Sequence, residues 1–109
     1  MMERIHHIVA GAAWERALVV SRYRHPSLAQ EGFIHFSTSE QIEGTARKHY
    51  AGQRDLLLLT IDPQLLDAEL RWEPSRGGEL FPHLYGELAV TAVVDVRPID
   101  PEHPLRDLP

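Results

Sequence analysis

Cysteine is absent from this 109-residue chain, which excludes disulfides, thiolate metal sites and cysteine nucleophiles. No apolar run approaches the roughly 20 residues that a membrane-spanning helix needs. Basic residues are in the minority, 11 against 16 acidic ones, whereas a dedicated nucleic-acid binder normally carries a clustered positive surface. The chain therefore has the composition of one globular domain with neither a membrane span nor a dedicated nucleic-acid surface.

Most motifs with a known mechanism are missing as well. The sequence has no phosphate-binding loop, no glycine fingerprint for dinucleotides, no zincin helix motif and no nucleophile elbow. The first residues, among them Glu3 and Arg4, do not resemble a secretory signal, so we expect a cytoplasmic protein. Function must therefore be inferred from individual polar side chains.

The order of the predicted elements is that of a mixed α+β domain. Hydrophobic periodicity and turn residues predict strands over 4–9, 33–36, 56–61, 70–73 and 88–96, helices over 12–20 and 39–50, and short helical turns after Pro26 and over 63–66. Four prolines from Pro98 onward argue against regular strand pairing. We therefore predict one α+β domain over residues 1–97, followed by a proline-rich tail over residues 98–109.

The predicted strand that begins at Phe33 carries unexpected polar chemistry. Side chains of a strand alternate between its two faces, so Phe33, His35 and Ser37 share one face. Ile34 and Phe36 then point the other way, into a core. A core strand that presents an imidazole and a hydroxyl side by side indicates a functional surface.

A helix is predicted to begin directly after this strand. Ser37 with Glu40, or Thr38 with Gln41, has the spacing of a capping box. The free N–H groups and the positive dipole end of such a helix can bind an anion. We therefore predict that Ser37 binds a ligand, although capping alone would also explain a serine there.

Two further histidines extend this hypothesis. His7 shares a strand face with Ile5 and Val9, so it is either a core histidine or part of a pocket wall. His83 lies in a Phe-Pro-His-Leu-Tyr-Gly segment, where Tyr85 can share its face and the flanking Pro and Gly indicate a turn. We predict that His7, His35 and His83 line one cleft.

The remaining histidines are interpreted as structural or exposed. His6 faces away from His7 on the same strand, and His25, His49 and His103 are expected in a loop, on a helix surface and in the tail.

Positive charge close to the predicted cleft is limited to a few arginines. The Arg22-Tyr23-Arg24-His25 cluster could hold a phosphate or a carboxylate, or it could be a solvated loop. Arg24 and Arg47 are predicted to bind the ligand, with Arg22 as a further cation.

Several segments together resemble the family catalogued as domain of unknown function 952. The resemblance rests on His6-His7-Ile8-Val9, Trp14, Ser27-Leu28, Glu31-Gly32-Phe33-Ile34-His35-Phe36-Ser37, Leu70-Arg71-Trp72-Glu73 and Phe81-Pro82-His83-Leu84-Tyr85-Gly86. It implies an ADP-ribosyltransferase-like fold, in which two small mixed or antiparallel sheets with a few helices enclose a cleft.

Within that fold the closest motif similarity is to RNA 2′-phosphotransferases. His7 matches their first-strand histidine, Gly32-Phe33 their glycine element, and His35 with Ser37 their final His-x-Ser. The similarity implies that His7 and Ser37 face an NAD-like nucleotide, and that Glu73 orients its ribose. Ile8-Val9 departs from the Gly-Thr of the transferases.

The leading functional hypothesis is a small enzyme or binding domain for an NAD-like or phosphorylated nucleotide. Its catalytic residues would be His7, His35 and Glu73, and its ligand-binding residues Ser37, His83, Tyr85, Arg24 and Arg47. A non-catalytic small-molecule binding domain is the alternative. A metal-dependent hydrolase with a site of His7, His35 and His83 ranks lower, because no closely spaced ligand pair supports it. We expect no tightly bound metal or cofactor.

Overall fold

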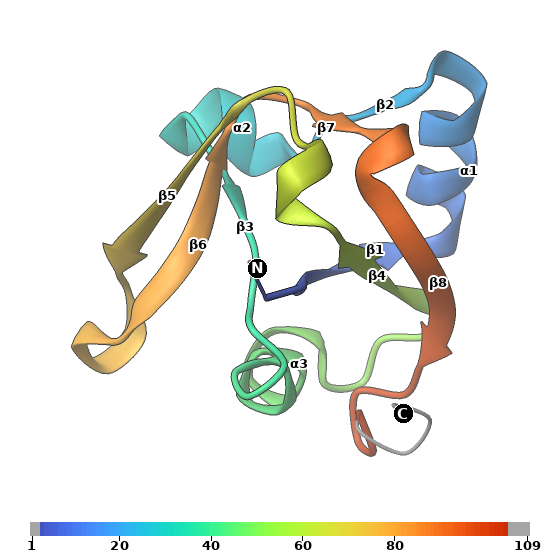
Figure 1. Cartoon of the computed structure of the whole chain (residues 1–109). Helices are drawn as coiled ribbons and strands as arrows, with labels where there is room; N and C mark the ends of the chain where they lie inside the picture. The colour runs from blue at the N-terminus through green and yellow to red at the C-terminus, as the bar shows by residue number, and fades with distance from the viewer. Residues whose placement is uncertain (1–2, 105–109) are drawn as a thin grey trace.

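A computed structural model describes residues 3–104 of the chain (Figure 1). It confirms a mixed α+β domain, and every strand pairing among these residues is antiparallel. Three sheets form within residues 3–104, where the resemblance implied two. The first sheet has the order β1-β4-β8, the second β3-β6-β5, and the third pairs β2 with β7.

The strands and helices follow the chain closely. The strands are β1 (Ile5–Ala10), β2 (Arg22–Tyr23), β3 (Ile34–His35), β4 (Leu56–Ile61), β5 (Glu69–Pro74), β6 (Leu80–Tyr85), β7 (Leu88–Ala89) and β8 (Val93–Ile99). The α-helices are α1 (Gly11–Val20), α2 (Pro26–Glu31) and α3 (Ile42–Tyr50). Three short 3₁₀ turns are η1 (Pro63–Leu65), η2 (Arg76–Gly78) and η3 (Val90–Ala92). No helix in this part of the chain is long and apolar enough to span a membrane.

Strand β4 is the centre of the first sheet because its apolar run lets it be buried on both faces. On one face Leu59 and Ile61 join the main core, which also takes Trp14 from α1 and Ile34 from β3. On the other face the strand packs against α3 through Leu56 and Leu58. The sheet therefore lies between α3 and the rest of the domain.

The two larger sheets meet at one backbone bridge. The N–H of His6 donates to the carbonyl of Ser37 at 2.7 Å, and the N–H of Ser37 donates back to His6 at 2.9 Å. Because Ser37 lies two residues after the end of β3, the bridge joins the edge strand β1 to the end of the second sheet. This junction positions the candidate site.

The predicted capping box forms between Thr38 and Gln41. The N–H of Thr38 donates to Oε1 of Gln41 at 3.0 Å, and the N–H of Gln41 donates to Oγ1 of Thr38 at 3.2 Å. Helix α3 itself begins at Ile42, three residues later than predicted, because the capping residues form a turn of their own. The alternative pair, Ser37 with Glu40, does not form, since the Ser37 hydroxyl lies 2.8 Å from Oγ1 of Thr45.

Three predictions near the C-terminal end were wrong. The strand expected over 88–96 is divided into β7 and β8 by the 3₁₀ turn η3. His83 lies within strand β6, where a turn was indicated. Strand β8 continues through Pro98, which pairs with Leu57, because an edge strand tolerates a residue without an N–H. Residues 105–109 of the predicted tail lie outside the described residues.

Candidate functional site

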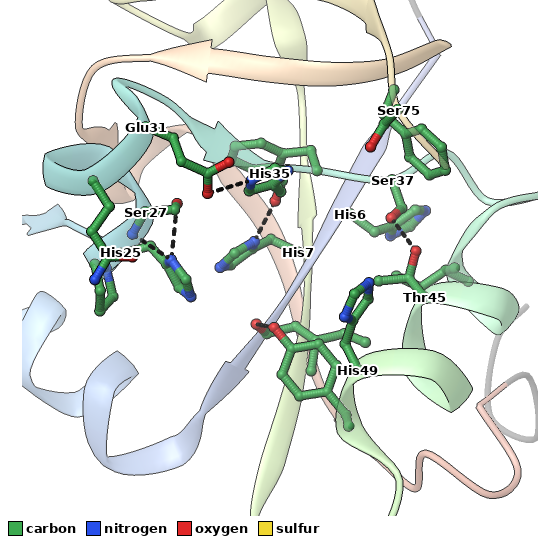
Figure 2. A pocket seen from close by; sticks show the side chains of 17 residues that line it. His6, His7, His25, Ser27, Glu31, His35, Ser37, Thr45, His49 and Ser75 are labelled. Atoms are coloured by element: carbon green, nitrogen blue, oxygen red, sulfur yellow. Dashed lines mark hydrogen bonds and ion pairs between the residues drawn. The ribbon is translucent and has the colours of Figure 1, made fainter. Parts of the chain in front are cut away.

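A pocket of about 430 Å³ lies at the junction of the two larger sheets (Figure 2). Its walls come from β1, from α2 and the residue before it, from the end of β3, and from α3, with one residue each from β6 and from the loop after β5. The described residues that line it are His6, His7, Ile8, His25, Pro26, Ser27, Gln30, Glu31, His35, Phe36, Ser37, Ile42, Thr45, His49, Tyr50, Ser75 and Phe81. Five of the lining residues are histidines, and none is a lysine or an arginine.

His7 is held by both of its ring nitrogens. Nδ1 lies 2.8 Å from the carbonyl oxygen of His35, and a carbonyl can only accept, so Nδ1 carries the proton. Burial lowers the pKa of His7 to about 4. The ring is therefore neutral at pH 7, and Nε2 accepts the hydroxyl proton of Tyr23 at 2.9 Å. The sequence allowed either a core or a pocket-wall residue, and His7 is both.

His25 caps helix α2 from the residue before Pro26. Its Nδ1 accepts the backbone N–H of Ser27 at 3.0 Å, so in the neutral ring the proton lies on Nε2. Burial lowers the pKa of His25, with a further contribution from His35. Among residues 3–104 no group forms a hydrogen bond with Nε2, which leaves a donor available at the pocket wall.

His6 also lines the pocket, contrary to the prediction that it points elsewhere. Its side chain lies on the α3 face of the first sheet, where Nδ1 is 3.2 Å from Oγ1 of Thr60 and Nε2 is 3.0 Å from Oγ of Ser39. Burial lowers its pKa. Both His6 and His7 line the pocket because it lies where β1 bridges to Ser37. Strand alternation alone predicts only that the two side chains lie on opposite faces of β1.

His35 and Ser37 both line the pocket, but their side chains form different contacts. His35 is half exposed, and its Nε2 lies 3.0 Å from a carboxylate oxygen of Glu31 at the end of α2. Ser37 is only 3 % exposed, and its hydroxyl is paired with Thr45 of α3. Ser37 therefore ties the strand to the helix, while His35 is at the accessible rim.

Of the remaining predicted site residues, three form a separate cluster on one face of the second sheet. Oε1 of Glu73 lies 2.8 Å from Nδ1 of His83 and accepts the hydroxyl of Tyr85 at 2.7 Å. These two hydrogen bonds hold the pKa of Glu73 below its usual value. The His83 ring stacks on Phe33 and meets the edge of His35 at 5.1 Å. None of the three lines the pocket, so the predicted common cleft of His7, His35 and His83 was wrong.

The predicted ligand-binding arginines also lie outside the lining. Arg24 lies 3.7 Å from Glu87, and Arg47 lies 3.1 Å from Glu43 one helical turn earlier. Each of these cations is therefore paired with a carboxylate, and Glu87 also lies 3.6 Å from Arg22.

No group of three or more histidine, aspartate or glutamate side chains among the described residues could hold a metal ion. The alternative site of His7, His35 and His83 is therefore not formed. Both nitrogens of His7 are occupied by other partners, and His83 turns its Nδ1 to Glu73.

Fold and site together define a small α+β domain with a histidine-lined pocket where two antiparallel sheets meet. The chain belongs to a protein family of unknown function, DUF952, which it matches over residues 8–96. His25, His35 and His49 fall within the matched segment, whereas His6 and His7 precede it.

Solved structures of one bacterial protein are similar to the chain. The crystal structure of protein CC0527 from Caulobacter crescentus is 39% identical, covers 89% of this chain and 86% of that chain, and has a TM-score of 0.83. The solution NMR structure of CC0527 is likewise 39% identical, covers 91% of this chain and 86% of that chain, and has a TM-score of 0.79. No curated protein is significantly similar to the chain.

Proposed function

We propose that the histidine-lined pocket binds a small uncharged molecule with a planar polar ring, about the size of a nucleoside. Its volume of about 430 Å³ is within the range of small-molecule sites, roughly 300–1,000 Å³. Such sites combine apolar and aromatic walls with a few fixed polar groups. Phe36, Phe81 and Tyr50 supply the aromatic walls here, and the histidines supply the polar groups.

The observation that carries the proposal is that the pocket concentrates histidines whose charged form is disfavoured. Burial lowers the pKa of His6, of His7 and of His25. Because no lysine or arginine lines the pocket, it offers hydrogen bonds from neutral rings and little positive charge. A phosphate would lose its water without gaining a matched cation, whereas an uncharged heterocycle would keep its hydrogen bonds.

Two polar side chains at the wall are available to such a ligand. The neutral His25 ring presents an Nε2–H donor, and the hydroxyl of Ser75 forms no hydrogen bond with any residue of the described part. Figure 2 places Ser75 near Ser37, away from His25, so the two groups could hold opposite ends of one ligand.

The proposal narrows the expectation of an NAD-like nucleotide to its uncharged base and ribose. A diphosphate would have to lie outside the pocket, where Arg24 and Arg47 would first have to leave Glu87 and Glu43. An ADP-ribosyltransferase-like fold and a group-transfer activity stay predictions from the resemblance.

Thermal shifts with matched nucleosides and nucleotides test the proposal. Adenosine, inosine and uridine would each be compared with its own 5′-phosphate, and all of them with ADP-ribose and NAD. At about 100 times its dissociation constant a ligand stabilises the fold by roughly 2.7 kcal/mol. For a domain of this size that raises the melting temperature by on the order of ten degrees, at about 4–8 °C per kcal/mol. We expect at least one nucleoside to raise the melting temperature more than its own 5′-phosphate does.

One variant separates binding from folding. His25→Asn keeps a side chain that can cap α2 but removes the Nε2–H donor, so it should reduce the shift while leaving the ligand-free melting temperature nearly unchanged. His103→Ala, at an exposed position, is the control. Melting-temperature shifts confined to NAD and ADP-ribose would contradict the proposal that the pocket binds an uncharged ligand.

A further inference from the structure

An exposed serine is hydrogen-bonded to a buried histidine beside the start of α3. Oγ of Ser39, in a surface turn, lies 3.0 Å from Nε2 of His6, in the edge strand β1. His6 is only 6% exposed, whereas Ser39 is open to solvent. A hydroxyl within hydrogen-bond reach of a histidine is the arrangement that activates serine as a nucleophile.

The other nitrogen of His6 is oriented by a third group. Nδ1 lies 3.2 Å from Oγ1 of Thr60, and the carboxylate of Asp95 lies farther along the same row. His6, Thr60 and Asp95 are register partners across β1, β4 and β8, so their side chains share one face of the sheet. When the N–H at Nδ1 donates a hydrogen bond to Oγ1 of Thr60, Nε2 is left as an acceptor for the Ser39 hydroxyl.

Two backbone donors in the same turn have no partner among residues 3–104. The N–H groups of Ser39 and Glu40 donate no hydrogen bond to any residue of the described segment, as is usual at a helix start. They lie in the turn that precedes α3, beside its positive end, where developing negative charge is stabilised. The turn therefore offers a nucleophile and donors for an oxyanion, and β1 offers the base His6.

We propose that Ser39 is a nucleophile activated by His6, and that it reacts with acyl and phosphonyl electrophiles such as activated esters and fluorophosphonates. With an ester, Oγ forms a bond to the carbonyl carbon as its proton passes to Nε2 of His6. The bond from that carbon to the leaving oxygen breaks, and the departing alkoxide takes the proton from His6. Water then hydrolyses the acyl-serine with His6 acting as the base again.

Two other serines near histidines lack this arrangement. Ser27 lies 2.9 Å from Nδ1 of His25, but its hydroxyl donates to the carbonyl of Phe33 at 2.8 Å and its side chain is buried. The hydroxyl of Ser37 pairs with Thr45 instead of a histidine. Ser39 thus combines exposure with a histidine partner.

The inference stands apart from the proposed ligand, because Ser39 does not line the pocket and the reaction needs no nucleoside. Its only shared residue is His6. A protein that binds nucleosides without reacting, or reacts without binding them, would support one proposal and contradict the other.

A fluorophosphonate probe tests the nucleophile directly. Oγ forms a bond to phosphorus, the phosphorus–fluorine bond breaks, fluoride leaves, and the Ser39 proton passes through His6 to water. We expect one adduct per chain by intact mass and its assignment to Ser39 by peptide mapping. Ser39→Ala, an exposed change, should abolish the adduct. Ser21→Asn, a change that suits the left-handed backbone at φ 65°, should label like the wild type.

The role of His6 needs a readout other than folding. His6→Gln should slow labelling by about 10²–10⁴-fold, the usual contribution of a general base. His103→Ala is the matched control. Thr60→Val keeps Ser39 and His6 but removes the hydroxyl that lies beside Nδ1 of His6. We expect this variant to be labelled more slowly than the wild type and with a different dependence on pH. In the wild type the labelling rate should rise with pH to a plateau, with the midpoint of the rise below pH 6.5. Burial lowers the pKa of His6, although the Leu59 carbonyl and Asp95 oppose that shift.

Three results would overturn the proposal: an adduct on another residue, an adduct that persists in Ser39→Ala, or no adduct on the wild type after prolonged incubation at pH 8. A labelling rate unchanged in both His6→Gln and Thr60→Val would remove His6 from the reaction.

Discussion

Nδ1 of His7 lies 2.8 Å from the carbonyl oxygen of His35, which ties the first sheet to the strand of the second sheet that borders the pocket. The bond fixes the tautomer of His7 and leaves Nε2 to accept from Tyr23. One neutral imidazole therefore depends on groups from two other strands, β2 and β3.

This arrangement predicts a loss of stability in mild acid. Burial lowers the pKa of His7 to about 4 from the model-peptide value of 6.5, so the unfolded chain binds more protons than the native one between these values. Stability should therefore fall as the pH drops below 6.5. At about 1.36 kcal/mol per pKa unit, His7 alone should cost roughly 2 kcal/mol between pH 7 and pH 5.

Urea unfolding at several pH values measures this contribution. His7→Gln keeps a polar side chain that does not titrate, so its stability should fall less between pH 7 and pH 5 than that of the wild type. His6 and His25 contribute in the same direction, because burial lowers both pKa values, so some pH dependence should remain. Identical pH profiles for His7→Gln and the wild type would contradict the neutral state of His7.

Removing the hydroxyl of Tyr23 should destabilise the fold without changing its shape. Tyr23→Phe leaves Nε2 of His7 buried without a donor, which costs about 1–3 kcal/mol. Tyr85→Phe removes a hydroxyl whose acceptor, Glu73, is partly exposed to water, so its effect should be smaller. Chemical denaturation of the two variants gives the comparison, and equal losses would argue against a special role for the buried pair.

The capping box before α3 should contribute measurably to stability. Thr38→Ala removes the acceptor for the N–H of Gln41 and should cost about 0.5–2 kcal/mol. Thr38→Ser retains the hydroxyl and should recover most of that loss. Thermal melts of the three proteins at one pH would decide, and a Thr38→Ala protein as stable as the wild type would show that the box adds nothing.

Gly86 is required by a close approach of two loops. A Cβ at this position would lie 2.7 Å from Cβ of Ala68, so Gly86→Ala should destabilise the fold by about 1–3 kcal/mol through overpacking. The double variant Gly86→Ala with Ala68→Gly removes the clash and should recover part of that stability. Urea unfolding would measure the coupling, and additive effects of the two changes would contradict a direct contact.

Elements with a strong local signal could be predicted from the sequence. The apolar run of β4 and the Thr38–Gln41 spacing each have one good structural solution, and both are found in the structure. No strand was predicted around His83, because the flanking Pro82 and Gly86 allowed a turn there, yet Pro82 is in the central strand of its sheet. The missing N–H is tolerated there because β3 ends at His35, next to the position opposite Pro82.

The site was harder to predict than the fold. Strand alternation placed His35 and Ser37 correctly, but it could not show that both His6 and His7 reach one pocket, because two sheets meet there. His49 was predicted on the surface of its helix and is exposed, but it also lines the pocket, because its spacing from Ile42 and Ala46 places it on the same side of α3 as these buried residues. That spacing was the signal available for His49. The likeness to ADP-ribosyltransferases stays a prediction.

The two-bond bridge between His6 and Ser37 makes the pocket depend on how two halves of the molecule dock. If the bridge opens while each sheet keeps its own ladder, the pocket is lost before either half unfolds. The amide hydrogens of His6 and Ser37 therefore report this opening through their exchange with solvent deuterium, and a bound ligand should slow both together.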